Sequence, residues 1–126
     1  MIEAALYEYL TGYTALVTLV AKRIYPDILP QNSPMPAITY QRISTLPYQT
    51  RDGGGYQRPR FQFSCYGNTA LAAVQLVETL ETALLAFTRS DDPRVDVALI
   101  EGRTQNYDPD TKLYKQTLDA FIWHTT

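Results

Sequence analysis

Apolar side chains recur at alternating steps of three and four residues between Asn68 and Phe87, which is the spacing of one helical face. Polar residues fall on the opposite side, so the pattern predicts a helix lying on a sheet. We expect the helix to begin at Asn68, whose side chain can accept a hydrogen bond from an N–H of the first turn. The apolar face consists of Ala70, Ala73, Val77, Leu80, Leu84 and Phe87, with Leu76 beside it.

The same helix has a second apolar edge. Leu71, Val74 and Leu85 fall outside the main face, next to Glu78 and Glu81. A helix with two apolar sides packs against something besides its own sheet. The N-terminal helix or another subunit is the expected cover.

Helical spacing also marks the N-terminus. Apolar residues from Ile2 to Tyr13 predict a first helix, Gly12 interrupts it, and the stretch from Leu16 to Val20 predicts a short second helix. Four prolines then punctuate residues 23–36, so this segment is predicted to be extended or looped, with a short edge strand near Ile24 and Tyr25.

Period-two patterns predict the strands. They lie at 37–43, with a register shift near the end, at 61–66, at 95–99, where Val95, Val97 and Leu99 alternate with Asp96 and Ala98, and at 113–123. The Asp-Pro-Asp sequence within 106–112 predicts a tight connection. The fold class is therefore α+β: a mainly antiparallel sheet of four to five strands packed against one long helix, with an N-terminal helix pair, in a single domain over 1–126.

Two aromatic residues sit unexpectedly on the polar face of the last strand. Leu118, Ala120 and Ile122 point one way, whereas Phe121 and Trp123 share the side of the charged and hydroxyl residues. Large aromatics on a solvated face need a cover, either the first helix or a partner.

Residues 46–60 have no apolar period. Three consecutive glycines occupy 53–55, and glycine-rich backbone is entropically costly to order, so the segment is predicted to be a flexible loop or a long, loose hairpin end. Its arginines could meet phosphate or a carboxylate on a partner, or the segment could be simply solvated. The residues of interest in it are Tyr48, Arg51, Gly53, Gly54, Gly55, Tyr56, Arg58 and Arg60.

Composition narrows the classes of function. Apolar residues make up 45% of the chain and charged residues 19%, which is typical of a globular domain. A net charge of −2 argues against a dedicated nucleic-acid binder, and no apolar run approaches the length of a membrane span. The single cysteine cannot form an internal disulfide, and residues 1–10 show no basic region of a signal peptide, so a reducing cytosol is expected. Ten tyrosines suit either a core or an interface.

No enzyme constellation is found in the sequence. His124 ends a strand, Cys65 shares a face with phenylalanines, and Asp108 with Asp110 fits a turn better than a metal loop. We therefore expect no catalytic residue, no cofactor and no metal site. The remaining enzyme or ligand-binding hypothesis is a pocket rimmed by Tyr40, Tyr66 and His124.

Taken together and in order, these segments resemble the tail-completion, or tail-terminator and tail-to-head joining, proteins of long-tailed bacteriophages and prophages. The resemblance covers nearly the whole chain. It is carried by ALYEYL near the N-terminus, ALVTLVAKRIYP at 15–26, PAITYQRIS at 36–44, FQFSCYG at 61–67, the helix at 68–87, and YDPDTKLYKQTLDAFIW at 107–123.

The resemblance implies a virion structural protein assembled in the bacterial host cytoplasm. Such a protein caps the tail tube, usually as a six-membered ring, and offers a surface to the head's connector while DNA passes through the lumen without sequence-specific binding. The implied partners are further copies of the chain, the tail-tube protein and a head-completion or connector protein, with no membrane. A head-completion or stopper role in the neck is the neighbouring alternative. Besides residues 48–60 above, the candidate interface comprises Leu71, Val74, Leu85, Phe121 and Trp123.

Overall fold

The computed structural model describes residues 2–49, 55–91, 93–110 and 112–125. Within these ranges the elements are α1 (Ile2–Gly12), α2 (Thr14–Val20), β1 (Ile24–Pro26), β2 (Ala37–Gln49), β3 (Gly55–Gly67), α3 (Ala70–Leu85), β4 (Val95–Asp108) and β5 (Leu113–Thr125). The strands form one sheet in the order β1-β2-β3-β5-β4. Only the β1–β2 pair is parallel among these strands, so the α+β class with a mainly antiparallel sheet is confirmed.

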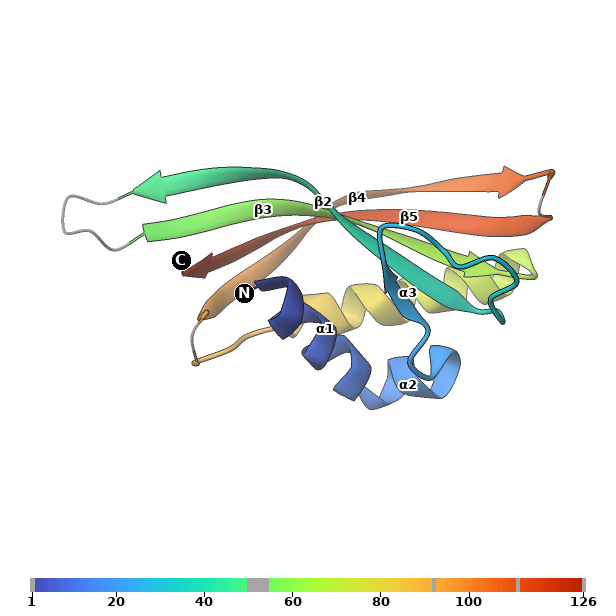
Figure 1. Cartoon of the computed structure of the whole chain (residues 1–126), viewed down its shortest axis with the longest axis horizontal. Helices are drawn as coiled ribbons and strands as arrows, with labels where there is room; N and C mark the ends of the chain where they lie inside the picture. The colour runs from blue at the N-terminus through green and yellow to red at the C-terminus, as the bar shows by residue number, and fades with distance from the viewer. Residues whose placement is uncertain (1, 50–54, 92, 111, 126) are drawn as a thin grey trace.

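The described helices all lie on one face of the sheet, and the other face is left open (Figure 1). The outer ends of the β2–β3 and β4–β5 hairpins point toward opposite ends of the molecule (Figure 1). We call the two sides of the sheet the helix-covered face and the open face.

The core lies between α3, the N-terminal helices and the helix-covered face. The predicted apolar face of α3 is confirmed: Leu80 and Leu84 are fully buried and meet Phe61 and Phe63 of β3 in one cluster. Burial of each such side chain contributes roughly 1.5–3 kcal/mol relative to exposure. The core thus fixes which side of α3 faces the sheet, and leaves its opposite side for other contacts.

The start of α3 differs from the prediction by one residue. The N-cap is Thr69, whose side chain accepts a hydrogen bond of 3.1 Å from the backbone N–H of Ala72, whereas Asn68 is exposed. The preceding strand runs very close to the first turn of the helix, since a Cβ on Gly67 would lie 2.9 Å from the backbone nitrogen of Ala73. That close approach leaves two residues for the turn and puts Thr69 in the capping position.

Two of the strands extend into segments for which the sequence predicted a connection or a hairpin end. Residues 106–108 belong to β4, which runs from Val95 to Asp108 along β5, so the tight connection is shorter than the expected 106–112. Residues 46–49 and 55–60 continue β2 and β3, pairing Tyr48 with Tyr56, which agrees with the long hairpin end that was one of the two expectations for this segment. These segments are held in the sheet by backbone hydrogen bonds between paired strands. Such pairing leaves no apolar period in the sequence from which it could be predicted. The expected register shift in β2 is confirmed between Arg42 and Ser44.

Candidate functional site

An aromatic and aliphatic cluster with one arginine occupies the open face. Strand alternation turns Phe121 and Trp123 of β5 away from the helices, and the β4–β5 register sets Leu99 beside Phe121 and Val97 beside Trp123. The guanidinium carbon of Arg58, on β3, lies 4.2 Å from the ring centroid of Phe121 and 5.5 Å from that of Trp123. We call these five residues the open-face patch: Arg58, Val97, Leu99, Phe121 and Trp123.

The first helix, one of the two expected covers of Phe121 and Trp123, does not cover them. The first helix, α1, lies on the opposite side of the sheet and cannot cover them (Figure 1). Arg58 stacks on them instead, a cation–π contact worth roughly 0.5–2 kcal/mol. The patch is still accessible at its β4 side, where Val97 is 37% and Leu99 50% exposed.

Val97 and Leu99 were not among the predicted interface residues. A bulge between Val95 and Val97 shifts the register, so Val95 is buried toward the helices while Val97 and Leu99 lie on the open face. Simple alternation puts all three on one side. The alternation of Ala98 with Ile100 was the only sequence sign of the shift.

The two described arginines of the predicted interface have different surroundings. Arg60 is ion-paired within the chain, 3.3 Å from a carboxylate oxygen of Glu101 and 3.1 Å from one of Asp119. Arg58 has no carboxylate partner among the described residues, and its buried Nε has no hydrogen-bond acceptor there. Arg58 therefore carries a charge that the described part of the chain does not neutralise.

Other predicted interface residues lie at the end of the β2–β3 hairpin. The backbone register pairs Tyr48 with Tyr56 and Gln49 with Gly55, and Tyr56 also pairs with Thr125 of β5. The hairpin end is thus joined to the strand that carries Phe121 and Trp123. The predictions for Arg51, Gly53 and Gly54 lie outside the described residues.

The second apolar edge of α3 is exposed. Leu71 is 82% and Leu85 57% exposed, and Val74 is half-buried. Glu78 is exposed and falls on the same line of the helix, because steps of three, four and seven residues lie on one side. We call these four residues the outer helix stripe: Leu71, Val74, Glu78 and Leu85.

The N-terminal helices use a different side of α3. The phenol of Tyr9 on α1 donates a hydrogen bond of 2.7 Å to the backbone carbonyl of Ala83, and its ring stacks on Phe87 with 4.5 Å between centroids. Ala83 is fully buried, whereas Leu85 is exposed. The outer helix stripe is therefore not covered by α1, which was one of its two expected covers; the other was another subunit.

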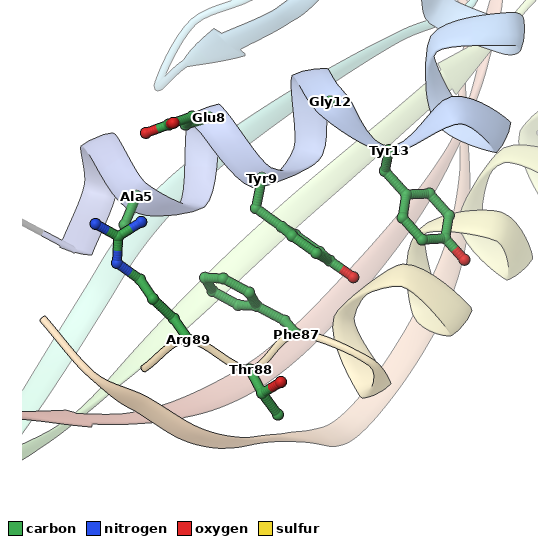
Figure 2. A pocket seen from close by; sticks show the side chains of 8 residues that line it. All are labelled: Ala5, Glu8, Tyr9, Gly12, Tyr13, Phe87, Thr88 and Arg89. Carbon is green, nitrogen blue, oxygen red and sulfur yellow. The ribbon is translucent and has the colours of Figure 1, made fainter. Parts of the chain in front are cut away.

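A shallow groove of about 320 Å³ runs between α1 and the segment that follows α3. Figure 2 shows Tyr9 and Phe87 forming its aromatic floor, with Glu8 on α1 and Arg89 reaching toward the start of that helix. Burial raises the pKa of Tyr9, so its phenol stays a neutral hydrogen-bond donor at physiological pH. The groove offers aromatic and charged contacts for a partner.

The residues proposed for an enzyme pocket are not brought together. Tyr40 and His124 are buried on the helix-covered face, whereas Tyr66 lies on the open face, since β3 turns Cys65 toward the helices. His124 Nδ1 is 2.8 Å from the carbonyl oxygen of Thr125, and burial lowers its pKa. Burial raises the pKa of the Cys65 thiol and keeps it unreactive.

Two further features are absent from the part of the chain that the structure describes. No group of three or more histidine, cysteine, aspartate or glutamate side chains is placed to hold a metal ion. No helix in the same ranges is long and apolar enough to cross a membrane.

Comparisons with known proteins give a family and a fold. A family model described as "Tail completion protein gp17" matches residues 4–125. A comparison with curated protein sequences finds no significant match. Among solved structures, a chain of the "Virion of native gene transfer agent (GTA) particle" has a TM-score of 0.80 and 12% sequence identity, over 95% of this chain and 91% of that chain. At this identity the likeness shows that the two chains share a fold.

Proposed function

This chain belongs to the tail completion protein gp17 family, and we propose that it caps the finished tail tube and joins the tail to the head as a ring of copies. Membership makes it a structural component of a phage virion rather than an enzyme. The ring, its six-fold symmetry and its position at the end of the tube are the proposal.

One observation carries it: the chain exposes two different apolar surfaces on its two layers. The outer helix stripe lies on α3, and the open-face patch lies on the side of the sheet away from the helices (Figure 1). A closed ring of identical subunits needs two unlike patches, one for each neighbour. A domain with a single exposed patch would instead favour a two-fold dimer.

Charge supports a conduit for DNA through the lumen. The chain carries 11 lysines and arginines against 13 aspartates and glutamates, and Arg60, Arg42, Arg94 and Arg103 are all ion-paired within it. A lumen lined by many free cations would hold the phosphate backbone, whereas a neutral or slightly acidic one lets DNA slide. Sequence-specific DNA binding forms no part of the proposed role.

The proposed partners are further copies of the chain, the tail-tube protein and a head-completion or connector protein. Purified protein mixed with headless tail tubes tests this by negative-stain microscopy. A cap of density at one end of each tube, with tubes of uniform length, is the expected result. Free protein beside unaltered tubes would contradict it, and binding to portal or adaptor protein in a pull-down would then establish the stopper role in the neck.

A further inference from the structure

We propose that neighbouring copies in the ring contact each other through the outer helix stripe of one and the open-face patch of the next, with Glu78 set against Arg58. This inference rests on the proposed ring and identifies the surfaces that form it. It assigns one occupant to each surface, namely a second copy of this chain.

The two surfaces match in composition. The outer helix stripe has leucines at both ends, with Val74 and the carboxylate of Glu78 between them. Glu81 lies on the same side of the helix but is held by Arg103, and α3 contains no lysine or arginine. The open-face patch has two aliphatic and two aromatic side chains around one guanidinium. An apolar surface with a central acid therefore faces an apolar surface with a central base. Such an arrangement excludes water at the rim and fixes the register at the centre.

Glu78 and Arg58, the two central charged residues, differ from their charged neighbours in having no ion pair within the described residues. Glu81 is 3.7 Å from Arg103, and Arg60 is held by Glu101 and Asp119, so these groups are paired within the chain. Neither Glu78 nor Arg58 has an ion-pair partner among the described residues.

The surroundings of Arg58 also call for an acceptor. Its guanidinium is stacked on an aromatic surface, and its buried Nε has no hydrogen-bond partner in the described ranges. Buried polar groups are normally satisfied, and arginine binds a carboxylate through two parallel hydrogen bonds. A glutamate arriving on a neighbouring helix would pair with the charge of the guanidinium group.

The placement of the surfaces makes the contact propagate. The stripe belongs to the helix layer and the patch to the open face, so a copy that uses its stripe still has its patch free (Figure 1). This head-to-tail arrangement generates a ring or an open helix of copies, whereas identical surfaces would stop at a dimer. The chemistry thus favours a second copy over a single capping partner.

Charge reversal with rescue tests the contact. The variants are Glu78→Arg, Arg58→Glu and the double variant, and assembly is followed by sedimentation velocity over a concentration series and by capping of headless tail tubes. We expect each single variant to raise the concentration for half-assembly at least about tenfold, and the double variant to restore most of the loss. Melting temperatures by circular dichroism check that each variant is folded.

Two exposed residues provide matched controls. Asp91→Arg reverses an exposed carboxylate, and Lys22→Glu reverses an exposed cation; neither residue belongs to the two surfaces or lines the groove beside α1. Both should assemble as the unaltered chain does. A mixture of the two singly reversed proteins adds a further check, because alternating copies restore opposite charges at every contact and an even-numbered ring should therefore assemble from the mixture.

The outcomes separate this inference from the proposed function. Rings that form normally in both singly reversed variants would overturn the Glu78–Arg58 contact and leave the ring intact. Loss in the single variants without rescue in the double would also overturn it. If the unaltered chain forms no ring alone or on tail tubes, the proposed function fails and the contact falls with it.

Discussion

Arg58 lies over the ring of Phe121, with 4.2 Å between its guanidinium carbon and the ring centroid, although the two residues come from strands on either side of α3 in the sequence. The contact exists because β3 and β5 are neighbours in the sheet. It covers part of an aromatic surface on a face that no described helix protects, and it presents a cation at the centre of that surface (Figure 1).

Removing this stacking should expose the only tryptophan in the chain. Arg58→Ala is expected to cost roughly 0.5–2 kcal/mol of unfolding free energy, measured by urea denaturation, since a cation–π contact is lost. Acrylamide should quench the fluorescence of Trp123 more strongly than in the unaltered chain, because the guanidinium lies 5.5 Å from its ring. Lys22→Ala is the control, and equal quenching in the two variants would contradict the stacking.

Two leucines of α3 should respond in opposite ways to truncation. Leu80 is fully buried, so Leu80→Ala should destabilise the fold by about 2–5 kcal/mol in urea denaturation. Leu71 is 82% exposed, so Leu71→Ala should change stability by less than about 0.5 kcal/mol and weaken assembly instead. A large loss of stability in Leu71→Ala would mean that the outer helix stripe is part of the core.

The hydrogen bond that joins α1 to α3 should contribute measurably to stability. Tyr9→Phe removes the 2.7 Å bond to the carbonyl of Ala83 and keeps the ring that stacks on Phe87. We expect a loss of roughly 0.5–1.5 kcal/mol in the unfolding free energy. Tyr7→Phe, on the exposed side of the same helix, is the matched control and should be neutral. Equal effects of the two changes would assign the loss to the helix rather than to the bond.

Stability should fall in mild acid because of His124. Burial lowers the pKa of this residue in the folded state, while the unfolded chain has the ordinary value of about 6.5. The unfolded state therefore binds the proton more readily, so the stabilisation is complete above that pH and is lost as the pH falls below it. Melting temperatures measured from about pH 8 to about pH 5 test this, because a histidine titrates within roughly that range. His124→Gln should flatten the profile, and an unchanged slope would assign the acid sensitivity to other groups.

The helix pattern shows how much of the site could be read from local sequence. Steps of three and four residues placed Leu80 and Leu84 on the sheet side of α3 and Leu71 and Leu85 outside it, as the structure has them. Strand alternation likewise turned Phe121 away from Ile122. Both deductions succeed because side-chain direction follows from the backbone repeat alone. The family resemblance, carried by the order of such segments, is confirmed by the match over 4–125.

The remaining features were set by partners far away in the chain. The polar residues 101–108 form a strand because β5 lies alongside them, and a bulge after Val95 turns Val97 and Leu99 onto the open face. Arg58 covers Phe121 because β3 and β5 are neighbours in the sheet. The N-cap of α3 is Thr69 rather than Asn68 because Gly67 lies against the first turn of the helix. The sequence by itself determined the helices and their buried sides, the central parts of the longer strands, and the family. Tertiary structure alone decided the surfaces, because strand pairing and register depend on contacts that no local period encodes.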